Sequence, residues 1–202
     1  MNKSAKKSVR KPLQARSKAT VDTIIEAAAQ ILARQGWQGL NTNRIAAVAG
    51  VSIGSVYEYF ANKEAVLDAI IDQHLTEGEQ LLGNASIKAE ISIQPKGLIK
   101  LIVQSYIALH QQNPRLHRVL SAEVPLRRQH RERISALRKT AIDFVSKQLS
   151  SHGGDSQLKA ALIIDTADAL THRWIIDEVS GPIDPQRLAS ELEKMLISYL
   201  AP

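Results

Sequence analysis

The segment from Thr42 to Phe60, "TNRIAAVAGVSIGSVYEYF", constrains the fold of this 202-residue chain more than any other. Gly50 separates two short runs whose apolar residues follow helical spacing, and neither run is long enough to form a stable helix by itself. A glycine permits a sharp turn between two helices, and such a pair needs a third helix beneath it. The preceding segment supplies one, with an apolar stripe formed by Val21, Ile24, Ile25, Ala28, Ile31 and Leu32. The pattern therefore predicts a helix-turn-helix.

The polar residues of the second short run indicate what this motif offers to a partner. We expect the inward positions to be Ile45, Ala46, Val48, Ala49, Val51, Val56 and Phe60. The outward positions are then Ser52, Ile53, Gly54, Ser55, Tyr57 and Tyr59, at or near the start of the second helix. Hydroxyl groups can bond phosphates or base edges, an isoleucine can touch a thymine methyl group, and a glycine lets a backbone approach closely. The structural alternative is a small helical corner whose polar residues face water.

Local signals place the helix ends of this region. Gly36 is expected to end the first helix, whereas Thr42, Ser52 and Asn62 are each expected to cap the start of one. Lys63 then falls in the first turn of the third of these helices, where backbone N–H groups and its ammonium can hold one phosphate together.

The positive charge of the chain is concentrated at its start. The formal net charge is +6, and seven cations precede the first acidic residue, Asp22. They are Lys3, Lys6, Lys7, Arg10, Lys11, Arg16 and Lys18. A basic arm beside a folded unit is a common source of phosphate contacts, so residues 1–18 are predicted to support binding to nucleic acid. The alternative is a solvated tail that aids solubility.

Helical periodicity continues along almost the whole chain, and no segment alternates in polarity as a strand would. The predicted fold class is all-α, with about nine helices. We expect a basic flexible arm over 1–18, a helix-turn-helix domain over 19–66 and a helical body over 67–202. The apolar pattern lapses between Gly83 and Pro95.

The segment "GLNTNRIAAVAGVSIGSVYEYFANKEAVLDAI" closely resembles the DNA-binding signature of the TetR family of bacterial repressors. The resemblance implies phosphate contacts at Thr42, Ser52, Tyr57 and Lys63. It implies base contacts at Asn43, Ile53, Gly54, Ser55 and Tyr59, although some members carry arginine where this chain has Asn43. It also implies a homodimer, a double-stranded DNA operator and a helical body that binds a small-molecule effector.

The body offers candidates for the last two of these roles. The stripe formed by Leu188, Leu192, Met195, Leu196 and Tyr199 is predicted to face a partner subunit, although it could equally pack internally. The candidate ligand-binding residues are Tyr106, His110, Phe144, Thr171 and Trp174, and the aromatic ones could instead only fill the core. Asp168 and His172 are four residues apart and are expected to pair along one helix.

Several classes of protein lack support in the sequence. The chain has no cysteine, no histidine spacing typical of a metal site and no catalytic motif, so we expect neither a metal, nor a cofactor, nor an enzyme. It has no secretory signal and no apolar run that could span a membrane, and these features are compatible with the cytoplasm. The function predicted is a sequence-specific transcriptional regulator, released from a palindromic operator by a ligand. The alternative is a basic protein that coats DNA without sequence preference and without an effector.

Overall fold

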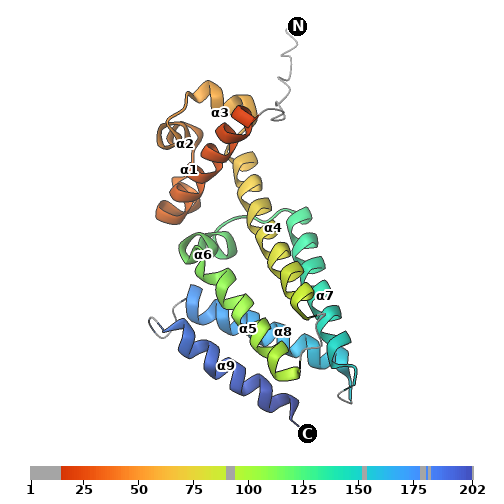
Figure 1. Cartoon of the computed structure of the whole chain (residues 1–202). Helices are drawn as coiled ribbons and strands as arrows, with labels where there is room; N and C mark the ends of the chain where they lie inside the picture. The colour runs from red at the N-terminus through yellow and green to blue at the C-terminus, as the bar shows by residue number, and fades with distance from the viewer. Residues whose placement is uncertain (1–14, 90–93, 152–153, 178–180, 182, 202) are drawn as a thin grey trace. The chain divides into compact units, whose positions relative to one another are not determined.

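The protein is described by a computed structural model that covers residues 15–89, 94–151, 154–177, 181 and 183–201. Across these ranges the chain forms nine α-helices and a short π-helical turn, and no β-strand (Figure 1). The predicted all-α class is confirmed. Most of the predicted basic arm lies outside the described residues. Helix α1 (Ala15–Gly39) includes Arg16 and Lys18, so these two belong to a helix and not to an arm.

The chain folds into two compact units. The first contains residues 1–73 together with 119–124, and the second contains residues 74–118 and 125–202. Helix α4 (Lys63–Ala89) carries the chain from the first unit into the second, and α6 (Pro114–Ala122) carries it back. The boundary predicted between 66 and 67 falls inside the continuous helix α4, seven residues before the point where the units divide.

Three helices and the start of a fourth build the first unit. Helix α2 (Thr42–Ala49) packs on α1 and on α3 (Ile53–Tyr59), and α4 follows (Figure 1). Gly50 adopts φ 65° and ψ 29°, a left-handed conformation that a glycine tolerates without strain. The buried core of this unit comprises Ile24, Ala27, Ala28, Ile31, Leu32, Leu40, Ile45, Ala46, Val56, Phe60, Val66, Leu67, Ile70, Ile71, Val119 and Leu120.

The caps of these helices are close to those predicted. The Ser52 side chain accepts a hydrogen bond from the Ser55 N–H at 3.0 Å, and Asn62 does the same for Ala65 at 2.9 Å. The cap of α2, however, is Asn41 and not Thr42, because the Asn41 Oδ1 accepts from Arg44 N at 2.9 Å. Both residues are suitable caps, and the sequence does not fix which of two neighbours adopts the extended conformation.

The end of α1 is fastened to a segment far along the chain. Gly36 has φ 67° and ψ −174°, which interrupts the helix, and the next N–H, that of Trp37, donates to Glu123 Oε2 at 3.1 Å. A Cβ atom on Gly36 would lie 2.5 Å from the same carboxylate oxygen. The positive φ explains why a glycine occupies the position, and the hydrogen bond to Glu123 ties residues 119–124 into the first unit.

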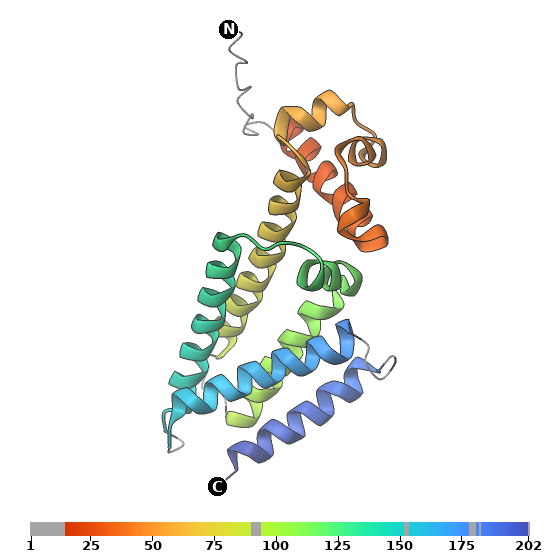
Figure 2. The same ribbon diagram turned by 180° about the vertical axis from the view of Figure 1, so that it is seen from behind.

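The second unit is a helical body built around α5 (Pro95–Gln111). Helix α5 packs against α8 (Ser156–Thr171) and α9 (Pro185–Leu200), and α8 packs against α7 (Arg128–Leu149) (Figures 1 and 2). Helix α8 continues into the π-helical turn η1 (His172–Ile176). Buried aliphatic side chains from all of these elements form one continuous core.

Helix α9 turns part of the stripe predicted to face a partner subunit into the chain's own core. Leu188, Leu192 and Leu196 are buried within the chain's own core, with Leu192 only 3% exposed. Only Met195 and Tyr199, each 44% exposed, remain available to a partner. The stripe predicted for a dimer interface is therefore divided, because the leucine side of α9 packs on α5.

Candidate nucleic-acid interface and internal cavity

The start of α3 is exposed in the first unit. Ser52, Ile53, Gly54 and Tyr57 are exposed, as is Asn43 on α2, whereas Thr42, Ser55 and Tyr59 are half-buried. On the opposite side of the helix, Val56 and the following Phe60 are buried in the core. Packing therefore turns Val56 inward and leaves Ile53, Gly54 and Tyr57 on the exposed side of α3.

Hydrogen bonds order these polar side chains among themselves. The Thr42 hydroxyl lies 3.1 Å from the Tyr57 hydroxyl, and the Ser52 hydroxyl lies 2.9 Å from that of Ser55. Each pair joins a side chain near the start of a helix to one from the next turn or the next helix. Groups held in this way lose less conformational entropy when they bind a partner.

Gly54 has no role in the internal packing of the unit. A Cβ atom placed there would meet only the Ser52 Oγ, at 3.6 Å, which is an ordinary van der Waals contact. Glycine also weakens the middle of a helix by about 1 kcal/mol relative to alanine. Internal packing therefore does not require a glycine at this exposed position.

Lys63 has a partner that sequence reasoning missed. Its ammonium lies 4.1 Å from the centroid of the Trp37 ring, at a distance typical of a cation–π contact. The backbone N–H of the same Trp37 donates the hydrogen bond to Glu123. The first turn of α4 is thereby positioned by the end of α1, and no sequence signal connects residues 37, 63 and 123.

One inward prediction for this unit is wrong. Val48 is 50% exposed, because α2 turns this residue away from the core that Ile45 and Ala46 enter. In an eight-residue helix a period of three to four fits more than one face, and the sequence does not decide between them.

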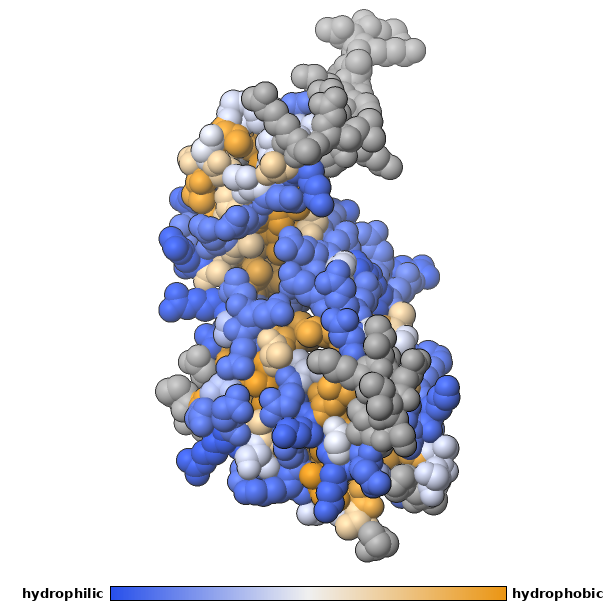
Figure 3. Space-filling model, in the orientation of Figure 1, coloured by the Kyte–Doolittle hydropathy of each residue, from blue (hydrophilic) through white to orange (hydrophobic). Residues whose placement is uncertain are grey.

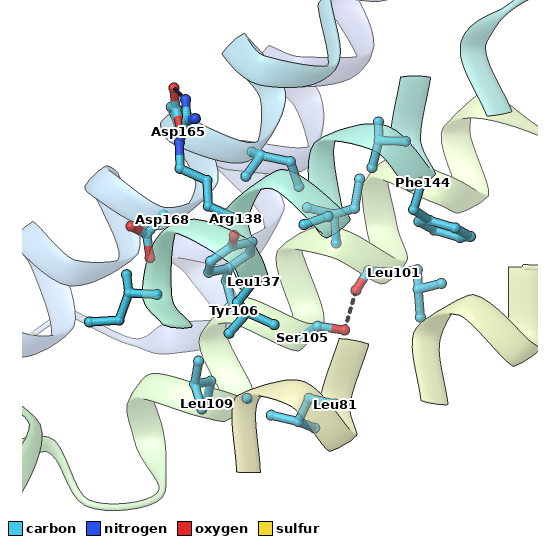
Figure 4. A pocket seen from close by; sticks show the side chains of 16 residues that line it. Leu81, Leu101, Ser105, Tyr106, Leu109, Leu137, Arg138, Phe144, Asp165 and Asp168 are labelled. Atoms are coloured by element: carbon cyan, nitrogen blue, oxygen red, sulfur yellow. Dashed lines mark hydrogen bonds and ion pairs between the residues drawn. The ribbon is translucent and has the colours of Figure 1, made fainter. Parts of the chain in front are cut away.

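The second unit contains a cavity of about 210 Å³ that is partly open to the surface. Residues from α4, α5, α7 and α8 line it, and most of them are apolar (Figure 4). The lining residues are Gly78, Leu81, Leu101, Ile102, Ser105, Tyr106, Leu109, Ile134, Leu137, Arg138, Ala141, Phe144, Val145, Ile164, Asp165 and Asp168. Apolar cavities of about 150 Å³ already accept a molecule the size of benzene, so this one can hold a small ligand.

The charged side chains of the cavity gather on one side of it. Figure 4 shows Arg138, Asp165 and Asp168 together, away from Phe144. Arg138 holds Asp165 through two parallel hydrogen bonds of 2.7 and 2.5 Å. Partial desolvation by the surrounding helices raises the pKa of Asp168, although its side chain keeps 59% exposure. Burial raises the pKa of Tyr106, so the Tyr106 hydroxyl stays protonated at neutral pH.

Two of the five predicted ligand-binding residues, Tyr106 and Phe144, line this cavity. His110, Thr171 and Trp174 do not. His110 and Thr171 are fully buried behind the cavity wall, and Trp174 packs against the core. An almost entirely apolar helix such as α5 does not reveal which of its faces borders a cavity and which packs on a neighbour.

Four histidines converge beside the cavity. His74, His110, His117 and His172 come from α4, α5, α6 and η1, and their neighbouring ring centroids lie 4.5 to 5.9 Å apart. The His74 Nε2 and His117 Nδ1 atoms are 3.1 Å apart and share a hydrogen bond. Burial lowers the pKa of His74, His110 and His117, and that of His117 falls to about 3.

Asp168 and His172, which are expected to pair, each lie near a further partner. Asp168 Oδ1 lies 3.9 Å from His110 Nε2, and His172 Nδ1 lies 3.6 Å from Asp177 Oδ2. His172 is the first residue of η1, and its N–H still donates to the Asp168 carbonyl oxygen, so the two residues lie one α-helical turn apart.

Neither a metal cluster nor a membrane span stands out in the structure. Among the described side chains, no group of three or more histidine, cysteine, aspartate or glutamate residues is arranged to hold a metal ion. Similarly, within the ranges that the structure covers, every helix is too short or too polar to cross a membrane.

A helix-turn-helix with an exposed polar recognition helix, joined to a helical body with an internal cavity, defines a DNA-binding transcriptional regulator. Residues 24–70 match the family of bacterial regulatory proteins known as the tetR family, and residues 96–200 match the tetracyclin repressor-like C-terminal domain. The chain therefore belongs to the TetR family of transcriptional regulators. This family is one of regulators, and the DNA-coating alternative has no support from it.

Individual relatives agree with this assignment. The chain is 24% identical to the fatty acid metabolism regulator protein of Bacillus subtilis over 186 residues, which cover 87% of this chain and 92% of that protein. It is also 24% identical to the regulator UidR of Escherichia coli, with 89% of each chain covered. The crystal structure of the regulator FadR from Bacillus subtilis in complex with stearoyl-CoA shares the fold, with a TM-score of 0.66, 22% identity, and 88% and 97% of the two chains covered.

Proposed function

We propose that this regulator is an effector-released repressor that acts as a homodimer on a palindromic operator. The observation that carries the proposal is the composition of the cavity wall. Gly78 and Leu81 belong to α4, the helix that begins at Lys63 directly after the recognition helix α3. A molecule in the cavity therefore touches the same helix whose first turn is predicted to contact DNA.

Release requires only that the effector prefers one arrangement of the body over another. A ligand that shifts the Gly78–Leu81 turn moves one rigid helix along its length. In a dimer, two recognition helices must lie roughly 34–36 Å apart to enter successive major grooves. A change in the direction of α4 alters this distance, and operator affinity falls.

The surface of α8 and α9 supports the proposed homodimer. Leu158 and Leu162 on α8, and Met195 and Tyr199 on α9, are large apolar residues that are 44% to 55% exposed. Figure 3 shows the opposite face of the molecule, where apolar side chains lie scattered among mainly hydrophilic ones. Two such helices from each subunit can form a four-helix interface across a twofold axis.

The proposed DNA contacts are those that the resemblance to the TetR family implies. Thr42, Ser52, Tyr57 and Lys63 contact phosphates, whereas Asn43, Ile53, Gly54, Ser55 and Tyr59 approach bases. None of these residues is buried, and they cluster on α3 and on the first turns of α2 and α4, which supports the proposal. The similarity to a regulator solved with stearoyl-CoA supports an effector with an apolar body, as the cavity lining does.

The DNA part of the proposal is tested by genome-wide footprinting with the purified protein. We expect a short set of palindromic sites with fixed half-site spacing, and affinity that depends on that spacing. Occupancy spread evenly over the genome would instead support a protein that coats DNA.

The effector part is tested with an operator–reporter fusion and a compound that relieves repression. Ser105→Phe fills the cavity and removes only a hydrogen bond within α5, from the Ser105 hydroxyl to the Leu101 carbonyl. This variant should repress normally and no longer respond to the compound. Thr140→Phe is the matched control, because Thr140 makes the equivalent bond to the Ala136 carbonyl on the exposed face of α7. If Ser105→Phe responds as well as Thr140→Phe, the effector binds elsewhere.

A further inference from the structure

The charged end of the cavity carries one more carboxylate than it carries cations. Its lining contains a single guanidinium, that of Arg138, and two carboxylates, those of Asp165 and Asp168. The two hydrogen bonds between Arg138 and Asp165 use both oxygens of that carboxylate. A bidentate pair of this kind is geometrically complete, so Arg138 and Asp165 neutralise each other.

Asp168 is the carboxylate left over in the lining, and it has two histidine neighbours, His110 and His172. His172 forms its ion-pair contact with Asp177, at 3.6 Å from Nδ1 to Oδ2, and His110 does not neutralise Asp168. The His110 Nδ1 lies 2.8 Å from the Tyr106 carbonyl oxygen, which can only accept a hydrogen bond, so Nδ1 carries the proton. In the neutral ring, Nε2 then carries a lone pair and no proton. That atom is 3.9 Å from Asp168 Oδ1, beyond hydrogen-bond distance, and it offers no proton to the carboxylate. Burial lowers the pKa of His110, which keeps the ring neutral.

The Asp168 carboxylate can also be reached by a molecule in the cavity. Its side chain is 59% exposed although it belongs to the cavity wall. Tyr106 lies in the same wall, and within the described ranges its hydroxyl has no hydrogen-bond partner. An aromatic ring also attracts a cation over its face. A carboxylate, a hydroxyl and an aromatic ring at the end of an apolar cavity form a site for a positively charged group.

We propose that the effector of this protein is a small apolar molecule with a cationic end, such as an alkylamine or an alkylammonium ion, whose charge pairs with Asp168. This rests on the proposed function, in which the cavity receives the effector. It distinguishes this chain from the relative solved with stearoyl-CoA, since a coenzyme A ester carries several negative charges. An anionic end placed beside Asp165 and Asp168 would meet like charge, with Arg138 already engaged.

Three probes with the same apolar chain test the charge preference by titration calorimetry on the full-length protein at neutral pH. They are octyltrimethylammonium, octanoate and octanol, and stearoyl-CoA is a fourth ligand in the series. We expect octyltrimethylammonium to bind about tenfold more tightly than octanoate. An affinity for octanoate or stearoyl-CoA that equals or exceeds the affinity for the ammonium would overturn the proposal, as would no binding of any octyl compound.

Three matched substitutions assign the preference to a residue. Asp168→Asn should lower the affinity for octyltrimethylammonium about tenfold and change that for octanol by less than about twofold. Asp165→Asn should raise the affinity for octanoate, because Arg138 loses its partner. Asp143→Asn is the control, since Asp143 pairs with Lys139 on α7 and does not line the cavity. If Asp168→Asn binds the ammonium as the unsubstituted protein does, Asp168 is not the counter-ion.

A separate measurement of DNA binding keeps the two proposals distinguishable. If the protein occupies palindromic sites and is released by a neutral or anionic compound, the repressor function stands and the cationic effector does not. If the ammonium binds through Asp168 but no specific DNA site is found, the opposite holds.

Discussion

The two units of this protein differ in where they keep their polar side chains. In the first unit, polar residues lie on the surface of α2 and α3, and the interior is aliphatic apart from Phe60. In the second, His110, His130, Ser146 and Thr171 are buried, and these are the only buried polar residues among those whose burial the structure describes. All six histidines also belong to the second unit. Substitution of a polar residue on the surface therefore costs little stability, whereas substitution of a buried one costs more.

The largest expected effect comes from a substitution on the side of α9 that is buried in the core of the second unit. Leu192→Glu places a carboxylate at a position that is 3% exposed within one chain. We expect a loss of about 3–5 kcal/mol in the free energy of unfolding, measured by chemical denaturation, because the charge has no partner in an aliphatic core.

Met195→Glu is the control on the same helix. Met195 is 44% exposed, so its substitution should change stability by less than about 0.5 kcal/mol. It should instead weaken the homodimer in sedimentation if α9 faces a partner. Equal stability of the two variants would contradict the burial of the leucine side of α9 on α5.

These two residues show what the sequence could and could not predict. The stripe on α9 was visible from spacing alone, and so was the helix itself. Whether the stripe faced a partner or the chain's own core depended on the position of α5, which lies about ninety residues earlier in the sequence. Periodicity identifies an apolar face but does not name the surface that covers it.

Elsewhere in the chain, too, local features were predictable from the sequence and long-range contacts were not. Ser52 and Asn62 were predicted as caps because a cap depends on residues within one turn. The contact of Trp37 with Glu123 joins residues 86 positions apart, and nothing local indicates it. Tyr106 was assigned to the cavity on its aromatic character, whereas the role of Asp168 emerges only when four helices are assembled around it.

Acid is expected to lower the stability of the second unit alone. Burial lowers the pKa of His117 to about 3, so below about pH 6.5 the unfolded chain binds a proton that the folded body refuses. Stability is therefore complete above pH 6.5 and decreases as the pH falls. One unit of pKa corresponds to about 1.4 kcal/mol, so this histidine alone should remove about 2 kcal/mol at pH 5.

The two tryptophans of the chain allow this to be measured unit by unit. Trp37→Phe leaves only Trp174 in the second unit, and Trp174→Phe leaves only Trp37 in the first. Unfolding followed through Trp174 should become easier between pH 7 and 5, and His117→Asn should flatten that dependence. An equal acid sensitivity at Trp37, or an unchanged slope in His117→Asn, would show that the histidine cluster is not its source.

The third prediction separates stability from function on the surface of the first unit. Gly54→Ala should raise the free energy of unfolding by up to about 1 kcal/mol, because alanine is the better helix former and its Cβ meets nothing closer than 3.6 Å. The same variant should bind the operator more weakly in a fluorescence anisotropy titration, since the methyl group lies on the face proposed to approach bases.

Gly50→Ala is its counterpart at a glycine that the fold requires. Gly50 has φ 65°, so alanine there is strained and should cost about 1 kcal/mol of stability. If Gly54→Ala bound the operator as tightly as the unsubstituted protein, the backbone of α3 would not be in close contact with DNA.

The smallest effect on stability is expected at Lys63, where the two roles of one side chain can be separated. The ammonium sits over the Trp37 ring, and Lys63→Ala should lose the cation–π contact, about 0.5–1 kcal/mol of stability. Its effect on DNA binding should be distinct in kind. A phosphate contact carries no sequence information, so Lys63→Ala should weaken all operator variants alike and reduce the slope of log K against log salt by about 1. Ser55→Ala, at a proposed base contact, should instead change which operator variants bind and leave the salt slope unaltered.

Lys63→Arg is the informative intermediate, because arginine keeps the charge and can also stack on the indole ring. It should restore both the stability and the salt slope. A normal salt slope in Lys63→Ala would mean that the lysine serves only to fasten α4 to the end of α1, and the phosphate would then have to be held by Thr42, Ser52 and Tyr57.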